Sequence, residues 1–349
     1  MEIPARLGDL GEFRILGEHV IPALGDVGTH LGDDCAFVGI NTACALAVTS
    51  DRGPLPLAWS IEGARADYAD AGWLAVVASI SDLATTGARP LVITNNIEAP
   101  TSMLIADLRR YVVGIAAACR KFGFTHAGGD LSKGEQFSSH TTAIGIVDPL
   151  FKVGRHGCVP GEHVVAIGPM GTFAAAYLRA QRDGLESLTP LQRKALLRPR
   201  PQLSAMQRLT ANGLVSAASD CSDGVLGALA NLSEASGFGI QLETDRIEIP
   251  THVAREAAAN GLSHWNILFF WGDWQVVATT SHLERVIATV SPEHVSVLGR
   301  VIERGSGVWH ESDDVLRSVS TIRNEGFTRH GWAQDPRAHV RYMLETPIF

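Results

Sequence analysis

Short β-branched runs alternate with two long helices in the first half of the chain, and this alternation constrains the fold more than any other feature. The runs ALAVTS (45–50), LVITNNI (91–97) and HTTAIGIV (140–147) are bounded by turn residues and predict strands. Apolar residues recur at helical spacing over residues 68–86 and 103–122, and a glycine follows each segment. The first half is therefore predicted to be α/β.

The length of the chain predicts two domains. Its 349 residues exceed the roughly 250 to 300 at which a single core stops growing. A second set of predicted elements comprises strands at HVVAIG (163–168), near 239–243 and at 275–280, and a helix over 223–236. Between the two sets lies a segment rich in turn residues, which includes Asp148, Pro149, Gly157 and Pro160. We therefore expect domains at 1–150 and 151–349.

Composition excludes several classes of protein. Hydrophobic residues make up 46% and charged residues 19% of the chain, which excludes disorder, and no apolar run approaches the roughly 18 residues of a membrane helix. The N-terminus has no basic segment followed by an apolar core, so we expect a cytoplasmic protein without a membrane partner. A net charge of -8 without a basic cluster disfavours nucleic acid and favours small-molecule partners. Five scattered cysteines are expected to be reduced packing residues; they are Cys35, Cys44, Cys119, Cys158 and Cys221.

The stretch HAGGDLSKGE (126–135) is close to a phosphate-binding loop without being one. Gly129 and Gly134 have the G-x-x-x-x-G spacing of a nucleoside-triphosphate site. That loop needs Lys and then Ser or Thr after the second glycine, where this chain has Glu135. A carboxylate there would repel the outer phosphates, so a P-loop is excluded.

Aspartates that are accompanied by small residues are the main sign of a functional site. They are Asp33, Asp34, Asp51, Asp82, Asp130, Asp220 and Asp223. Small neighbours let the backbone approach a polyphosphate, and carboxylates provide the oxygen ligands that Mg²⁺ requires. Each motif alone also fits turn chemistry, and Ser222 or Asp223 could simply cap the helix that follows. Together the motifs favour a site for magnesium and a polyphosphate.

Seven motifs, in the same order over more than 200 residues, resemble the thiamine-monophosphate kinase family. They are GEFRIL (11–16), LGDDCA, GWLAVVASISDLATTGARP, HAGGD, GRHGCVPGE, LRPRPQ and DCSDGVLGAL. The same superfamily holds aminoimidazole ribonucleotide synthetase, selenophosphate synthetase and a hydrogenase maturation protein. The resemblance implies a two-domain α/β (α+β) fold of the aminoimidazole ribonucleotide synthetase type. It also implies a homodimer formed through the N-terminal sheets into a shared sheet or barrel, with ATP in a cleft at the dimer interface.

The resemblance also assigns roles to residues of this chain. The implied magnesium ligands are Asp33 or Asp34, Ser50, Asp51, Asp82, Asp130 and Asp223. The implied ATP contacts are Gly128, Gly129, Asp130, Arg155 and Ser222, with Arg155 facing the triphosphate. The catalytic residues would be Asp51, Asp223 and Arg155. Phosphoryl transfer needs mainly positioning and charge neutralisation, so these groups are chemically sufficient.

The acceptor side departs from the family pattern. TSDRGPLPLAWS keeps Asp51 but places Arg52 where the family has a small neutral residue, and FWGDWQ keeps Asp273 and Trp274 in register but lacks the family's glutamate. Phe327 and Trp332 in NEGFTRHGW could stack on an acceptor ring or could belong to the core. Arg52 would repel the thiazolium cation, so we expect thiamine monophosphate to be a poor acceptor, unless Arg52 points into solvent.

The sequence therefore predicts an ATP- and Mg²⁺-dependent kinase acting on a small-molecule acceptor. Two alternatives stay open at this point. One is a synthetase that uses ATP to activate an amide or carboxylate oxygen. The other is a nucleotide-binding regulator without turnover, which would have less need of several metal carboxylates.

Overall fold

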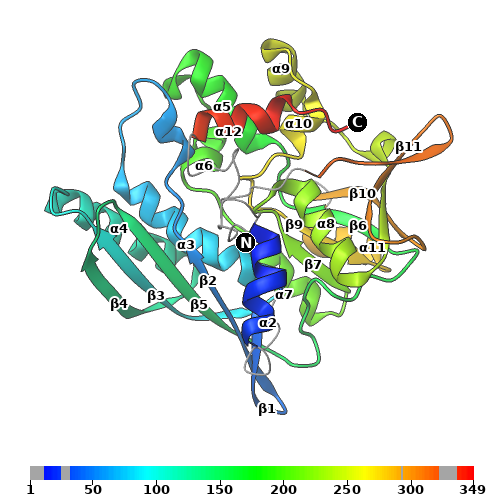
Figure 1. Ribbon diagram of the computed structural model, residues 1–349, viewed down its shortest axis with the longest axis horizontal. Helices are drawn as coiled ribbons and strands as arrows, with labels where there is room; N and C mark the ends of the chain where they lie inside the picture. Colours follow the sequence, from blue (N-terminus) through cyan, green and yellow to red (C-terminus); the bar gives the residue numbers. More distant parts are fainter. Residues whose placement is uncertain (1–11, 25–31, 292–293, 322–335) are drawn as a thin grey trace, which may run out of the picture.

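The computed structural model describes residues 12–24, 32–291, 294–321 and 336–349. Within them the chain forms two β-sheets, one from residues 36–147 and one from residues 163–318. Figure 1 shows the first sheet at the lower left and the second at the right, with the red C-terminal helix above both. No helix in the described ranges is both long enough and apolar enough to cross a bilayer.

The first sheet has five strands. They are β1 (Ala36–Asn41), β2 (Cys44–Arg52), β3 (Arg89–Ala99), β4 (Thr125–Lys133) and β5 (Ser138–Val147). Their order is β1-β2-β5-β3-β4, and all neighbours are antiparallel except β3 and β4. β2, β3 and β5 contain the three predicted runs, so those predictions are confirmed. β4 contains the glycine-rich stretch and forms an edge on which every residue is exposed.

Two helices, α3 (Tyr68–Thr85) and α4 (Ile105–Phe122), cover one face of this sheet (Figure 1). They pack closely because glycines face each other's backbone: a Cβ at Gly72 would lie 2.0 Å from the Tyr111 carbonyl oxygen, and one at Gly114 would lie 2.0 Å from that of Ala69. Nearly every residue of α3 is buried, more than a one-faced helix would be, because the helix also contacts the second half of the chain.

The second sheet has seven strands. They are β6 (His163–Ile167), β7 (Ala217–Asp220), β8 (Gly239–Leu242), β9 (Val276–Thr280), β10 (Val295–Ile302), β11 (Gly307–Ser312) and β12 (Val315–Ser318). Their order is β12-β11-β8-β10-β6-β9-β7, with β8 and β11 parallel and the other neighbours antiparallel. The strands predicted at 163–168, 239–243 and 275–280 are β6, β8 and β9.

The second half of the chain also contains helices. They are α5 (Thr172–Asp183), α6 (Pro190–Leu197), α7 (Leu203–Ala211), α8 (Gly224–Ser236), α9 (Thr251–Asn260), α10 (His264–Leu268), α11 (Leu283–Val290) and α12 (Pro336–Glu345). Short 3₁₀ turns occur at η4 (Leu57–Ser60), η5 (Leu185–Ser187) and η6 (Thr244–Arg246). α8 contacts β7, β8, β9 and β11, whereas α7 contacts α3 and α11. α7 thus lies between α3 and α11.

Among the described residues, the buried side chains form two clusters that do not divide at residue 150. One surrounds α5 and α8. The other lies beneath the first sheet but also takes in Val165, Met206 and Val276 from the second half. The division into 1–150 and 151–349 therefore stays a prediction.

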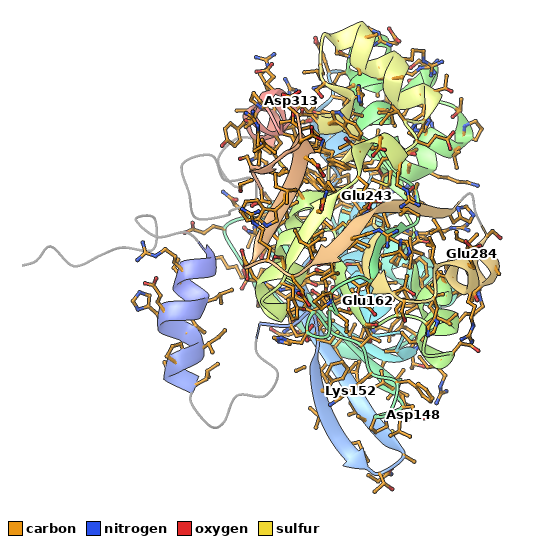
Figure 2. All side chains as sticks on the ribbon, turned by 90° about the vertical axis from the view of Figure 1, so that its right-hand side faces the viewer. Asp148, Lys152, Glu162, Glu243, Glu284 and Asp313 are labelled. Atoms are coloured by element: carbon orange, nitrogen blue, oxygen red, sulfur yellow. The ribbon has the colours of Figure 1, made fainter. Side chains whose placement is uncertain are left out.

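The N-terminal segment stands apart from the rest of the chain in Figure 2. It consists of α1 (Glu12–Ile15), the π-helical turn η2 (Leu16–Val20) and α2 (Ile21–Leu24). Leu16, Val20 and Leu24, which are four residues apart, are each 41% exposed and form an apolar stripe along it. The β1–β2 hairpin projects at the bottom of the same view, and Lys152, labelled there, lies 5.5 Å from the ring centre of Phe37 on β1.

Candidate functional site

Asp33 fixes the junction between the two halves of the chain. Its Oδ1 accepts hydrogen bonds from the backbone N–H groups of Asp34 and Arg155, at 2.8 and 3.0 Å. The chain approaches so closely that a Cβ at Gly154 would lie 2.2 Å from Asp33 Oδ2. The Gly154-Arg155 pair is thereby placed against the loop that precedes β1.

Arg155 is partly buried and pairs with carboxylates from both halves. Its Nε donates to Asp34 Oδ1 at 2.7 Å, its Nη2 lies 2.5 Å from the same oxygen, and its Nη1 donates to the Gly32 carbonyl at 3.1 Å. Nη2 also lies 3.9 Å from Asp220 Oδ1. The predicted ATP contact Arg155 and the predicted metal ligand Asp34 therefore bind each other.

Asp51, at the end of β2, and Asp82, on α3, form a second carboxyl pair. The two carboxyl groups influence each other's pKa, and the charge of Asp51 raises that of Asp82. Thr49 Oγ1 donates to Asp82 Oδ2 at 2.6 Å. Residues 49 and 51 face α3 because alternate residues of a strand share a face.

The carboxyl groups at this site hold protons more tightly than usual. Burial raises the pKa of Asp34 to about 7 against the opposing effect of Arg155, and burial raises the pKa of Asp51 to about 6. The pKa of Asp82 is raised well above its usual range, first by burial and then by Asp51, Asp220 and Asp34. Asp34, Asp51 and Asp220 thus all act on Asp82, and the four carboxyl groups form what we call the carboxyl cluster.

The cluster fits a divalent cation in its donor chemistry. It supplies only carboxylate oxygens, which suit Mg²⁺. A bound cation would also relieve the repulsion between neighbouring carboxylates, which raises the pKa of Asp82. Across the described part of the chain, no three His, Cys, Asp or Glu side chains already converge as ligands of one ion. The pairing of Arg155 with Asp34 is one reason, because it engages a carboxylate oxygen that a metal would need.

The turn between β7 and α8 adds Asp220, which sequence reasoning left out of the ligand set. Asp220 Oδ2 accepts a hydrogen bond from Ser222 N at 3.1 Å, and Asp220 N donates to Asp34 Oδ2 at 3.2 Å. Asp223 is the N-cap residue of α8, but its side chain makes no capping hydrogen bond. The signal for Asp220 was present in SDCSDG, where both aspartates lie beside small residues.

The Gly128-Gly129-Asp130 stretch lies elsewhere on the first sheet. Gly129 has φ +152°, and a Cβ there would lie 1.7 Å from the Asn95 carbonyl oxygen, so only glycine lets β4 approach β3 here. Asp130 is exposed, and its backbone N–H donates to Asn96 Oδ1 at 3.1 Å.

One chain does not bring Asp130 to the carboxyl cluster. The strand register aligns Arg52, His140, Asn96 and Asp130 in one row across the sheet, on the face opposite Asp51. Three strand spacings separate β4 from β2, which is about 14 Å. Ser50 lies on the same face as Asp130, where its hydroxyl is 3.1 Å from that of Thr142.

The predicted acceptor residues are dispersed. Arg52 is exposed at the end of β2. Asp273 is buried in the loop before β9. Its Oδ1 accepts a hydrogen bond from Phe173 N, at the N-terminus of α5, at 2.8 Å. Trp274 has φ +56° and packs partly buried against the core. Phe327 and Trp332 lie outside the described residues.

Known proteins resemble this chain along most of its length. The family model for AIR synthase related protein, N-terminal domain, matches residues 32–147, and that for the C-terminal domain matches residues 159–310. The thiamine-monophosphate kinase of Halobacterium salinarum is 31% identical over 292 residues, which cover 83% of this chain and 94% of that protein. The thiamine-monophosphate kinase of Methanospirillum hungatei is 29% identical over 250 residues, covering 68% and 79%.

The fold agrees with these matches. The solved structure of AaThiL complexed with AMPPCP and TMP superposes with a TM-score of 0.74 at 23% identity, covering 90% of this chain and 97% of that one. The predicted two-domain aminoimidazole ribonucleotide synthetase-like fold is thus confirmed. With both domain models matched and a 31% identical relative covered almost completely, the chain belongs to the thiamine-monophosphate kinase family and is an ATP-dependent kinase.

Proposed function

We propose that this kinase transfers the γ-phosphoryl group of ATP, with Mg²⁺, to the phosphate of thiamine monophosphate. The cluster of Asp34, Asp51, Asp82 and Asp220 carries the proposal. Buried carboxyl groups that repel one another are stabilised when a cation binds between them. AaThiL, which has the same fold, was solved with AMPPCP and TMP. The product would be thiamine diphosphate.

Magnesium would be held by carboxylates on both sides of the junction. Asp34, Asp51 and Asp82 come from the first half of the chain, and Asp220 and Asp223 come from the end of β7 and the turn before α8. Asp33 and Asp130 are further proposed ligands. Bound Mg²⁺ supplies charge neutralisation for the phosphate oxygens. Because the pKa values of Asp51 and Asp82 are raised, any protons that these carboxyl groups retain must leave before they act as ligands, so metal binding should release protons.

ATP would lie against backbone rather than against a P-loop. Gly128 and Gly129 leave the backbone of β4 free of side chains, and Ser222 is exposed beside the N-terminus of α8. Backbone N–H groups at such places favour phosphate oxygens.

Arg52 has a different proposed role from the one that its charge suggested. It is exposed on the outer face of the sheet, and the TMP bound by AaThiL carries an anionic phosphate as well as a cationic ring. We therefore propose that Arg52 attracts the acceptor phosphate, and the expectation of a poor acceptor is not retained. An acceptor phosphate is largely ionised near pH 7, so the attacking oxygen needs no general base. Asp273, Trp274, Phe327 and Trp332 stay proposed acceptor residues.

A homodimer in the cytoplasm is the proposed working form. The outer face of the first sheet carries the half-buried side chains of Leu46, Val48, Ile144 and Ile146. A second copy on this face would remove them from water. It would also lie next to Asp130, consistent with a site completed across the interface. The five cysteines are unpaired, which agrees with a reducing compartment.

The test is ATP-dependent turnover of thiamine monophosphate with Mg²⁺, with separate quantification of thiamine diphosphate, ADP and inorganic phosphate. Equal amounts of thiamine diphosphate and ADP support the proposal. Release of inorganic phosphate without thiamine diphosphate would contradict phosphoryl transfer to this acceptor.

A further inference from the structure

A row of polar side chains crosses the face of the first sheet that carries Asp51. Thr141 on β5 lies directly opposite Asp51 on β2, and it also lies directly opposite Asn95 on β3. Residues that are paired in this way have their side chains on the same face of the sheet. Thr141 and Asn95 are 0% and 4% exposed, so their polar groups need partners inside the protein. The row thus connects β3 with the carboxyl cluster.

Asn95 uses both atoms of its amide group in this row. Its Nδ2 donates to Thr141 Oγ1 at 2.5 Å, and its Oδ1 lies 3.1 Å from Nε2 of His126, which is on the edge strand β4. The other ring nitrogen of His126, Nδ1, accepts from the backbone N–H of Gly128 at 3.4 Å. Nδ1 therefore carries no proton, and Nε2 is the nitrogen that donates to Asn95. We call the contacts from Thr141 through Asn95 and His126 to Gly128 the Asn95 relay.

The glycine stretch of β4 is held from both faces of the sheet. Asn96, the next residue of β3, lies on the opposite face from Asn95, and its Oδ1 accepts from the backbone N–H of Asp130 at 3.1 Å. Every residue of β4 is exposed, and glycine loses more conformational freedom on ordering than any other residue. The two consecutive asparagines therefore order a segment that is intrinsically flexible, one directly and the other through His126.

We propose that His126, held by Asn95, is a positioning residue that orders the Gly128–Gly129 backbone before ATP binds. A backbone that is already ordered loses less entropy when it binds a ligand. The Asn95 relay should therefore increase the affinity for the nucleotide and leave the chemical step almost unchanged. The inference rests on the proposed place of ATP against β4.

Amide hydrogen exchange without nucleotide measures the ordering directly. We expect the Gly128 amide to exchange at least about fivefold faster in H126L and in N95L, because each variant breaks the relay and the segment opens locally more often. His126 is exposed, so H126L should keep its melting temperature within about 2 °C of normal. H282L is the matched control, since His282 is exposed before α11 and its side chain makes no capping hydrogen bond. It should change neither measurement.

Nucleotide binding measures the consequence of this ordering. The dissociation constant of AMPPCP with Mg²⁺, determined by calorimetry, should rise about tenfold in H126L and in N95L. KM for ATP should rise with it, while kcat stays within about threefold of normal. The N95L/H126L double variant should bind no more weakly than either single variant, because both substitutions interrupt the same relay.

Two further substitutions separate the two contacts of the His126 ring. Asparagine commonly accepts from the backbone N–H two residues ahead, so H126N keeps a partner for Gly128, and its affinity should be within about threefold of normal. The longer side chain of H126Q can reach Asn95 but provides no acceptor at the position of Nδ1. We therefore expect H126Q to bind AMPPCP as weakly as H126L.

Unchanged affinity for AMPPCP in H126L would overturn the inference, whether or not the Gly128 amide exchanges faster. So would losses of affinity that multiply to about 100-fold in the double variant, or an H126Q variant that binds as tightly as H126N. Failure of the proposed function is distinguishable, because the unsubstituted protein would then neither bind AMPPCP nor form thiamine diphosphate.

Discussion

Asp82 couples stability, pH and metal binding in one side chain. Its pKa is raised by burial and by neighbouring carboxyl groups, while the hydroxyl of Thr49 acts in the opposite direction. A carboxyl whose pKa is higher in the folded state stabilises the fold at low pH, and that stability is lost as pH rises through the folded pKa. At neutral pH and without metal, the Asp82 carboxyl therefore works against folding.

Replacing Asp82 by Asn should separate activity from stability. We expect D82N to lose at least about 100-fold in turnover, because a proposed metal ligand is removed. The free energy of unfolding of the metal-free protein at pH 8 should be unchanged or higher, because a buried charge is gone. Denaturant unfolding in EDTA and turnover at saturating Mg²⁺ measure the two effects. D245N, at an exposed position, should change neither, and normal turnover of D82N would remove Asp82 from the site.

Sequence pattern singled out the carboxyl groups of the cluster but not their pairings. Asp33, Asp34, Asp51 and Asp82 stood out because small residues accompany them, and all four lie at or beside the carboxyl cluster. That Arg155 binds Asp34, 121 positions away, has no signal in local spacing. Such pairs depend on how two sheets pack, which periodicity does not encode.

At the scale of elements, β4 depends on one glycine. A Cβ at Gly129 would overlap the Asn95 carbonyl oxygen, and φ +152° is unfavourable for other residues. We expect G129A to raise KM for ATP at least about tenfold, because β4 must move away from β3 and take with it the backbone that we propose contacts phosphate. G134A is the control: there φ is ordinary and the nearest atom would be 3.0 Å away, so KM should stay within about threefold. Equal KM values in both variants would contradict the role of Gly129.

The N-terminus of α5 provides a pH-dependent element. Burial raises the pKa of Asp273 to about 7 although backbone N–H groups of Phe173, Gly171 and Thr172 oppose the shift. Between its ordinary value near 3.8 and pH 7 the folded carboxyl keeps a proton that the unfolded one has released, so this group's stabilisation falls as pH rises.

D273N should remove that part of the pH dependence, since an amide does not titrate and its oxygen can still accept from Phe173 N. The measurement is the free energy of unfolding of both proteins from pH 4 to 8. The difference between them should change by a few kcal/mol, on the order of 1.4 for each unit of pKa shift. Parallel curves would show that Asp273 does not titrate in this range.

Element prediction succeeded where local signals agreed and failed where pairing decided the outcome. α4 ends at Gly123, which has φ +82°, as the glycine stop predicts. The HAGGD stretch gave turn signals, yet it is extended because β3 supplies hydrogen-bonding partners along β4. The second sheet's topology, with β6 between β9 and β10, depends on contacts far apart in sequence.

At the scale of the whole molecule, the two faces of the first sheet differ, since helices pack on the inner face while apolar side chains on the outer face are only half-buried. α3 and α4 cover the inner face, and α7 packs behind them. The outer face keeps its apolar side chains half-buried, and the N-terminal stripe of Leu16, Val20 and Leu24 adds further exposed apolar surface. The strands β2 and β5 were predicted from the sequence, but their alternating burial and the surface that covers the second face depend on tertiary packing.

Replacing Ile144 by Glu should dissociate the proposed dimer. Ile144 lies on central strand β5 and faces outward, so a carboxylate there would have to be desolvated when two sheets meet. We expect sedimentation at micromolar concentration to show a dimer for the unsubstituted protein and a monomer for I144E, with turnover reduced at least about tenfold because Asp130 loses the neighbouring copy. I105E is the matched control, since Ile105 is 82% exposed at the start of α4 and away from the sheet face, and it should sediment as a dimer. A monomeric unsubstituted protein with full turnover would refute the shared site, because Asp130 would then have to act from the opposite face of the sheet, about 14 Å from β2.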